Sequence, residues 1–290
     1  VRIKTHEKTR ADKEDDRTRH ILAARANTGL VFLLYRDRAE IDRLVAAVEQ
    51  GAPLYDFRSD DGIRHTVWIC PDPEPLTRAF AAVPQVYIAD GHHRAAAAVR
   101  VARELEPREP ARSGPSACTR FLGVLFPASQ LQILPYNRLV RDLNGLSPRA
   151  FLEAVRRRFT VFPDAPPAPD RPGRCSLYLD GAWHGIVLDP PAGADAVSAL
   201  DVSLLQEGLL GPVLGIEDPR TSPRIDFIGG IKGPDALVRQ IRSGQAAAAF
   251  SMHPVTVDHL MAVSDAGRTM PPKSTWFEPK LRSGLLLHTF

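Results

Sequence analysis

Cysteine is scarce in this chain of 290 residues. The three cysteines, Cys70, Cys118 and Cys175, lie far apart, and no C-x-x-C pair is present. Their odd number and wide spacing argue against both a disulfide framework and a zinc site. Three reduced thiols are typical of a cytoplasmic protein, and we expect that location.

Long apolar runs are absent as well. No run reaches about 18 residues, so the sequence predicts no membrane-spanning helix and no membrane partner. The chain begins Val-Arg-Ile-Lys, with neither an initiator methionine nor a signal-peptide pattern. We therefore expect that the full-length protein has an N-terminal part that is missing from this sequence.

An excess of charge of one sign is also lacking. The 37 basic residues barely exceed the 34 acidic ones, which gives a net charge of +3 and a pI near 8.9. The sequence shows no helix-turn-helix and no strongly basic stretch, so nucleic acid is not the expected partner. A mildly basic balance is compatible with a site for a small anion.

Strand and helix patterns alternate along the chain. This alternation predicts an α/β (α+β) fold, and the length predicts two domains or one large body with a lobe. The expected strands are 30–35, 64–70, 86–89, 121–126, 131–134, 176–179, 183–188 and 247–252, with a last strand in the C-terminal tail. The expected helices are 12–26, 39–50, 74–83, 92–105, 148–159, 201–210, 235–242 and 257–267. The turn Asp180-Gly181 makes a hairpin of strands 176–179 and 183–188, which we interpret as an insert or as the edge of a second lobe.

The stretch VYIADGHHRAAAAV, residues 86–99, places polar groups where a strand gives way to a helix. The first amides of a helix are unpaired and, with the helix dipole, favour an anion. Gly91 permits close approach of a ligand, and Arg94 offers a planar fork of donors suited to phosphate. Asp90, at the carboxyl end of the strand, is a candidate ligand for Mg²⁺ or for a reacting group.

The same stretch also has a purely structural interpretation. Asp90 would then cap the helix, and His92 and Arg94 would be solvated. The side chains of His92 and His93 point in different directions from a helix, so we do not expect both to bind one metal ion.

The same residues resemble sequence motifs of known protein families. The sequence Gly91-His92-His93-Arg94 resembles the G-x-x-R phosphate-binding motif of the ParB/sulfiredoxin superfamily. Its free-serine kinases carry a similar Asp-Gly-His-His-Arg signature. Five longer stretches resemble the domain-of-unknown-function 1015 family (DUF1015), also described as SerK-like: HEKTR at 6–10, YIADGHHR at 87–94, ILPYNRLV at 133–140, LDVSLLQ at 200–206 and MPPKSTWFEPKLRSGL at 270–285. Tyr136-Asn137 departs from the family pattern, in which Thr-His often precedes the arginine.

The resemblance implies a domain arrangement and an activity. It implies a ParB/sulfiredoxin-like nucleotide-binding core over residues 1–125, and an α+β portion over 126–290 that supplies the C-terminal loop. The implied activity is transfer of a phosphoryl group, with Mg²⁺, from a nucleotide such as ATP to a small-molecule hydroxyl. Free L-serine, giving O-phosphoserine, is the expected acceptor. In this scheme His92 or His93 contacts phosphate.

The HEKTR segment offers several charged groups. By analogy with the free-serine kinases, Glu7 is the candidate base that takes a proton from the substrate hydroxyl. His6, Lys8 and Arg10 are candidate phosphate ligands. The alternative is a charged, solvated helix entry. Arg17 is a further candidate for an anion, or a member of surface ion pairs with Asp15 and Asp16.

The C-terminal loop contains Lys273-Ser274-Thr275, which is not a P-loop because Pro272 stands where a glycine is needed. The proline-stiffened loop instead presents side chains, and we predict that Lys273, Ser274, Thr275 and Lys280 clamp an anion. Trp276 and Phe277 are expected to pack rather than to stack on a base, and His253 is expected to be structural.

Two other functions stay open beside the kinase. One is a nucleotide-dependent binding switch without turnover, as in partition proteins, which predicts nucleotide affinity and a protein partner. The other is a purely structural role, which leaves the clustered polar residues without a purpose. Detection of a phosphorylated amino acid separates the kinase from both.

Overall fold

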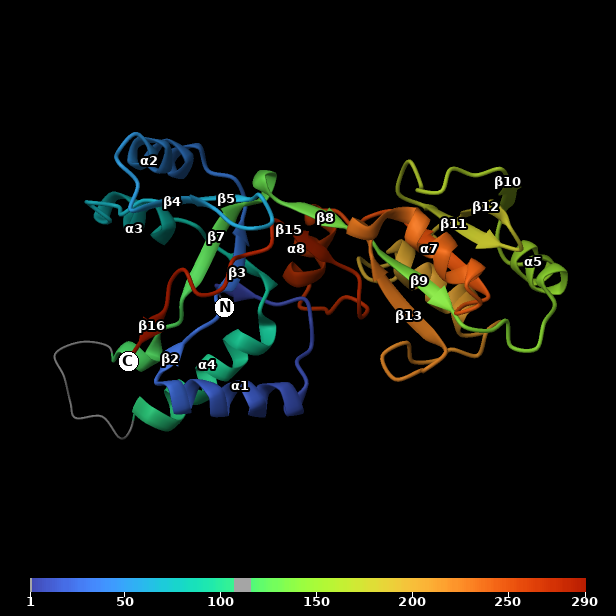
Figure 1. Ribbon diagram of the computed structural model, residues 1–290, viewed down its shortest axis with the longest axis horizontal. Helices are drawn as coiled ribbons and strands as arrows, with labels where there is room; N and C mark the ends of the chain where they lie inside the picture. The colour runs from blue at the N-terminus through green and yellow to red at the C-terminus, as the bar shows by residue number, and fades with distance from the viewer. Residues whose placement is uncertain (1, 107–115) are drawn as a thin grey trace.

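The computed structural model describes residues 2–106 and 116–290. Two separate sheets dominate the molecule and lie toward opposite ends of its long axis (Figure 1). The first has four strands in the order β1-β6-β3-β7, and the second has six in the order β10-β12-β11-β14-β9-β13. The predicted α/β (α+β) class is confirmed.

The first sheet is built on a fully buried strand. β3 (Val31–Tyr35) pairs antiparallel with β6 (Val86–Asp90) and parallel with β7 (Gly123–Pro127), while β1 (Ile3–Lys4) runs parallel to β6. Successive side chains of β3 point to opposite faces, so both faces need cover. Val31 and Leu33 pack beneath the helix that follows β6, and Phe32 and Leu34 belong to the large core cluster on the other face.

Helices pack against this first sheet in two pairs (Figure 1). α1 (Ala11–Ala24) lies along α4 (His92–Leu105), with Ile21, Ala97 and Val101 buried between them. α2 (Ala39–Glu49) packs on α3 (Glu74–Ala81). The alanine-rich sequence of α4 lets α1 and the sheet approach it closely, because small side chains leave room for close packing.

The second sheet is antiparallel throughout. Its strands are β9 (Tyr136–Val140), β10 (Val161–Pro163), β11 (Arg174–Leu179), β12 (Ala182–Val187), β13 (Ile225–Gly229) and β14 (Ala248–Met252). The predicted hairpin is present, but β11 pairs with β14 as well as β12, so the hairpin is integral to the sheet. The interpretation of the hairpin as an insert was therefore wrong, and the alternative interpretation, the edge of a second lobe, stays a prediction.

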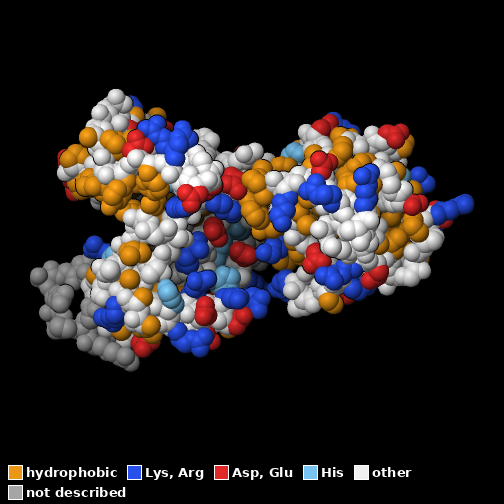
Figure 2. Space-filling model, viewed as in Figure 1, with side chains coloured by type: hydrophobic (Ala, Val, Ile, Leu, Met, Phe, Trp, Pro, Cys, Tyr) orange, Lys and Arg blue, Asp and Glu red, His pale blue; other side chains and the backbone are white. Residues whose placement is uncertain are grey.

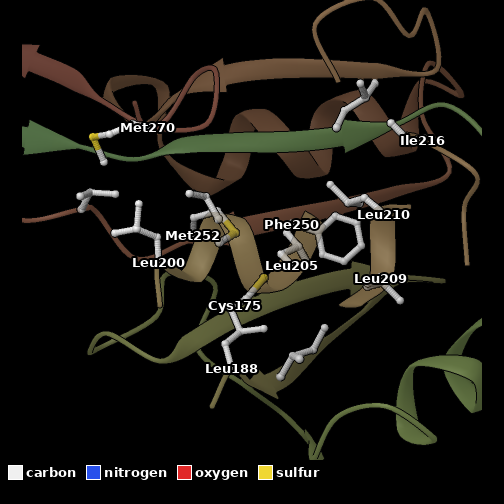
Figure 3. Packing of buried hydrophobic residues seen from close by; sticks show 14 of the residues in the cluster. Cys175, Leu188, Leu200, Leu205, Leu209, Leu210, Ile216, Phe250, Met252 and Met270 are labelled. Atoms are coloured by element: carbon white, nitrogen blue, oxygen red, sulfur yellow. The ribbon is translucent and has the colours of Figure 1, made fainter. Parts of the chain in front are cut away.

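One core cluster runs from the second sheet to the first. Cys175, Leu205, Phe250 and Met252 pack together between strands and the helical segment after residue 200 (Figure 3). The same cluster includes Phe32 of the first sheet, so apolar packing joins the two sheets. The helical elements on this side are α5 (Pro148–Arg156), α6 (Asp201–Leu205), a π-helical turn (Gln206–Leu210), α7 (Gly233–Arg242) and α8 (Val257–Asp265).

The C-terminal segment returns to the first sheet. The hydroxyl of Tyr87 donates a hydrogen bond of 2.9 Å to Asp265, and the amide of Met270 donates one of 2.7 Å to the carbonyl of His6. Three two-stranded ladders complete the fold: β15 (Trp276–Glu278) with β8 (Gln132–Leu134), β16 (His288–Thr289) with β2 (Ala26–Asn27), and β4 (Tyr55–Arg58) with β5 (Arg64–Val67). This return places the MPPKST loop beside HEKTR.

Several element boundaries differ from the prediction. α1 begins at Ala11, one residue before the predicted start, with Arg10 at its N-cap. It ends at Ala24, two residues before the predicted end, because Arg25 adopts a left-handed conformation. The predicted helix 201–210 is split by the π-helical turn. The sequence analysis missed the strands β1, β2, β4, β9, β10 and β13, and it expected one strand in the C-terminal tail, where the structure has β15 and β16. The proposed division between residues 125 and 126 stays a prediction. No helix among the described residues is long and apolar enough to cross a bilayer.

Candidate functional site

A cavity of about 250 Å³ lies where three distant segments meet: HEKTR, the end of β6 and the C-terminal loop. Acidic, basic and histidine side chains gather in the hollow between the two halves of the molecule (Figure 2). The cavity is lined by eight of the residues singled out from the sequence: His6, Glu7, Asp90, His93, Lys273, Ser274, Thr275 and Lys280. Segments more than 180 residues apart in the chain thus contribute to one concave site.

The junction between β6 and α4 depends on Gly91. Its φ of 99° is a left-handed conformation that favours glycine, and it turns the chain sharply from the strand into the helix. The Gly91 amide donates to one oxygen of Asp90 at 2.9 Å, and the Arg94 guanidinium donates to the other at 3.2 Å. A Cβ atom on Gly91 would lie 2.9 Å from Arg94 Nε, so the guanidinium rests against the glycine backbone.

Unpartnered buried atoms cluster at this junction. His6 Nδ1, His92 Nε2 and Arg94 Nε are buried and make no hydrogen bond, and they are three of the seven such side-chain atoms among the described residues. Buried polar groups are nearly always paired in folded proteins, so a group of orphans calls for a ligand, a water or a functional reason. All three border or lie behind the cavity.

The two buried histidines at the site, His6 and His92, are neutral at pH 7. His6 and His92 are 2% and 4% exposed, and their rings meet edge-on at 4.6 Å between centroids. Burial lowers the pKa of His6 to about 3 and that of His92 to about 4. At neutral pH neither ring therefore offers positive charge to a phosphate.

His92 faces Glu7 rather than the open cavity, with Nδ1 3.4 Å from Glu7 Oε2. The Glu7 side chain itself is 52% exposed. Partial burial raises the pKa of Glu7, opposed by the charges of His93 and Lys273. A carboxylate with a raised pKa at the wall of a cavity has the properties of a general base. The remaining histidine of the motif, His93, accepts a hydrogen bond of 3.0 Å from the amide of Arg10.

The C-terminal loop is held in a fixed shape. Lys273 has a φ of 55°, which is rare for a residue other than glycine, and the Ser274 hydroxyl donates to the Pro271 carbonyl at 2.6 Å. Phe277 is 2% exposed in the core, which confirms the prediction that it packs. The ammonium groups of Lys273 and Lys280 lie over the rings of Tyr136 and Trp276.

Other candidate residues lie outside the cavity lining. Arg10 forms an ion pair of 2.9 Å with Asp12, and Lys8 and Arg17 are exposed. Gly91, His92 and Arg94 form the junction behind the cavity instead of lining it. Among the lining residues, the sequence interpretation missed Tyr136, Met270 and Phe277 as site residues, although all three fall within the quoted family stretches.

Protein side chains at the site supply only part of the ligand set that a magnesium ion needs. Among the residues that the structure describes, no three His, Cys, Asp or Glu side chains come together as a closed metal site. Mg²⁺ is commonly held by one or two carboxylates together with water and substrate phosphates. Asp90, with a side chain 57% exposed at the cavity, suits that arrangement.

Comparison with known proteins places the chain in a family. Residues 1–203 match the model of a family of proteins of unknown function, DUF1015. The chain belongs to this family. No curated protein matches this DUF1015 chain.

Solved structures show the fold of this DUF1015 protein. SbnI with C-terminal truncation from Staphylococcus aureus is similar with a TM-score of 0.51 and 12% identity, over 99% of this chain and 82% of that one. A structure described as a free serine kinase in complex with AMP has a TM-score of 0.46 and 14% identity, covering 95% and 83%. A conserved hypothetical protein from Pyrococcus furiosus has a TM-score of 0.44 and 13% identity, covering 97% and 90%.

Proposed function

We propose that this protein is a phosphotransferase that moves a phosphoryl group from a nucleotide, ATP in the first instance, to the hydroxyl of a small molecule. The observation that carries the proposal is the meeting of Glu7, Asp90, Lys273 and Lys280 in one cavity, at the start of a helix. Phosphoryl transfer needs positioning and neutralisation of charge more than covalent help from the protein. The cavity supplies a base, a metal-competent carboxylate and two cations.

The donor phosphates would bind at the α4 end of the cavity. The first amides of α4 are unpaired by the helix itself, and the helix dipole adds partial positive charge there. Lys273 and Lys280 approach from the opposite loop. Arg94, which already contacts Asp90, would supply its unpartnered Nε to the same anion after a small movement. Asp90 would hold Mg²⁺ together with phosphate oxygens, and the ion neutralises charge on the phosphates when bound.

Glu7 would act on the acceptor. Its carboxylate takes the proton of the acceptor hydroxyl as the oxygen attacks the γ-phosphorus. The new P–O bond forms while the bond between the γ-phosphorus and the β–γ bridging oxygen breaks. ADP leaves with the bridging oxygen, and Glu7 releases the proton to solvent. General bases that are placed in this way contribute about 10²- to 10⁴-fold to rate.

The proposed acceptor is free L-serine, and the product is O-phosphoserine. The choice rests on the resemblance of Asp90-Gly91-His92-His93-Arg94 to the signature of the free-serine kinases. A cavity of about 250 Å³ also favours a small acceptor.

The test is incubation of the purified protein with ATP, Mg²⁺ and a panel of amino acids, followed by ³¹P NMR and nucleotide analysis. We expect a phosphomonoester with serine and an equal amount of ADP. The matched variants are Glu7→Gln, which removes the base, and Glu49→Gln, which changes an exposed glutamate on α2. Absence of any phosphorylated amino acid and of ADP formation overturns the proposal. Tight ATP binding without product would favour the nucleotide-dependent switch instead.

A further inference from the structure

Lys273 and Lys280 both line the cavity without a carboxylate partner. In the described parts of the chain, neither ammonium group has an Asp or Glu oxygen within 4.0 Å. This is notable because Glu7 and Asp90 line the same cavity. No ion pair with a described residue within this distance therefore orients either lysine.

Aromatic rings lie beneath both ammonium groups. Lys273 Nζ is 5.2 Å from the ring centroid of Tyr136, and Lys280 Nζ is 4.6 Å from that of Trp276. The two rings contact each other edge-on, with centroids 5.5 Å apart. We call Tyr136 and Trp276 the aromatic shelf. An ammonium group within about 6 Å of a ring centroid is attracted by the electron-rich face of the ring.

The aromatic shelf is fixed by the backbone on both sides. Tyr136 opens β9 in the second sheet, and Trp276 opens β15 in the C-terminal ladder. The indole Nε1 of Trp276 donates to Glu278 at 2.7 Å. Gly229, the register partner of Tyr136, makes room for the indole, because a Cβ there would lie 2.5 Å from the Trp276 ring. Rotation of the Trp276 indole is thus restricted.

A ring and a carboxylate have different consequences for a lysine. An ion pair neutralises the ammonium, and an incoming anion must then displace the carboxylate. A ring face attracts the cation without cancelling its charge, so the ammonium stays available to an anion. The left-handed backbone of Lys273 and the Ser274–Pro271 hydrogen bond direct the first lysine toward its ring.

We propose that the aromatic shelf positions Lys273 and Lys280 as unpaired cations for the phosphate chain of the nucleotide. Tyr136 and Trp276 are therefore positioning residues, which act through the two lysines. This inference rests on the proposed function, since the anion is taken to be the nucleotide. It assigns a role to Tyr136, which lines the cavity.

The test measures binding of ATP and of inorganic triphosphate by calorimetry, in the presence of Mg²⁺. Tyr136→Leu removes the ring and is expected to weaken binding of both probes about three- to tenfold, the range that cation–π attraction at partly exposed sites implies. Tyr136→Phe keeps the ring and should bind within about twofold of wild type. Lys13→Met, which removes an exposed lysine on α1, is the matched control and should bind like wild type.

A double-mutant cycle separates positioning from a structural role. In a Lys273→Met background, Tyr136→Leu should cause no further loss of affinity, because the cation it positions is gone. Trp276→Leu with and without Lys280→Met forms a second, independent cycle, which decides the matter if Tyr136→Leu does not fold. Equal losses with and without the lysine, in every cycle whose variants fold, overturn the inference.

The outcomes also separate the inference from the proposed function. If wild type binds ATP and the Tyr136 and Trp276 variants bind it with the same affinity, the role of the aromatic shelf is refuted and the kinase proposal stands. Shelf-dependent binding of triphosphate without phosphorylation of any acceptor supports the aromatic shelf and refutes the kinase. Failure of wild type to bind either probe refutes both.

Discussion

Replacement of Gly91 by alanine tests how the strand–helix junction serves the site. Gly91 has a φ of 99°, and a Cβ atom there would lie 2.9 Å from Arg94 Nε and 3.0 Å from Arg94 Nη2. The backbone term alone costs about 1–2 kcal/mol for a residue with a Cβ in the left-handed region. The contact itself is relieved cheaply, because the end of a long arginine side chain can move away.

The consequence for function is larger than the consequence for stability. A displaced Arg94 loses its hydrogen bond to Asp90 and moves away from the junction at which the phosphates are proposed to bind. Hydrogen bonds to charged groups contribute roughly 1.5–3 kcal/mol, so ATP affinity should fall about tenfold or more. Gly62→Ala is the matched control, because Gly62 has a φ of 80° and no atom within 4 Å of the added Cβ.

The assay combines urea unfolding with calorimetric titration of ATP. Both variants should lose about 1–2 kcal/mol of unfolding free energy. Only Gly91→Ala should lose nucleotide affinity. Equal ATP affinity in Gly91→Ala and Gly62→Ala would show that Arg94 and the α4 junction do not bind the nucleotide.

Two further predictions concern Glu7 and the buried histidines. Glu7→Gln should lower kcat at least 100-fold and leave the Kd for ATP within about threefold. The control Glu49→Gln should change neither quantity. A loss of ATP binding in Glu7→Gln that parallels the loss of kcat would contradict the role of Glu7 as a base. The lowered pKa of His92 predicts that the free energy of unfolding depends on pH. The contribution of the neutral His92 ring is complete above its pKa of 6.5 in the unfolded chain. It is lost as pH falls toward the folded pKa of about 4, by up to about 1.4 kcal/mol per pH unit. Urea unfolding at pH 7 and pH 5 gives the change in unfolding free energy for wild type and for His92→Gln, and the difference between the two changes is the effect of His92. Asp201, whose pKa is raised to about 6, has an opposite effect that is present in both proteins and therefore cancels. Equal pH dependence in the two proteins would refute the buried neutral ring.

Local features of the sequence predicted much of the fold. α4 runs over His92–Leu105 as expected, because Gly91 and the polar junction mark its start and the alanines sustain it. Ser147 and Thr256 cap their helices through side-chain oxygens, as their residue types predicted. Capping and helix propensity act within a few residues, so a single sequence carries them.

The missed strands depend on distant partners. β9 follows β8 after Pro135 alone, and its five residues are paired by β14 and β13, more than 80 residues later in the chain. β4 has only four residues, all exposed, so the alternation of Tyr55 and Phe57 with charged residues is too short to mark a strand. Its partner β5 falls within the predicted strand 64–70. Sheet order likewise depends on long-range pairing, which is why the central place of β11 was not predicted.

The candidate site also combines local features that the sequence reveals with contacts that depend on the fold. The polar junction at Asp90–Arg94 is a local pattern and could be found from the sequence. The burial of His6 and His92 could not, since it depends on the return of Met270 and Phe277 over HEKTR. The contact between Tyr136 and Lys273 joins residues whose proximity only the folded chain reveals.

The most direct test of the central claim is a crystal structure with a non-hydrolysable ATP analogue, Mg²⁺ and L-serine. We predict that the γ-phosphate lies between the first amides of α4 and the Lys273 ammonium, with the serine hydroxyl about 3 Å from the Glu7 carboxylate. A nucleotide bound in another cavity, such as the apolar one beside α3, or a serine hydroxyl remote from Glu7, would contradict the account.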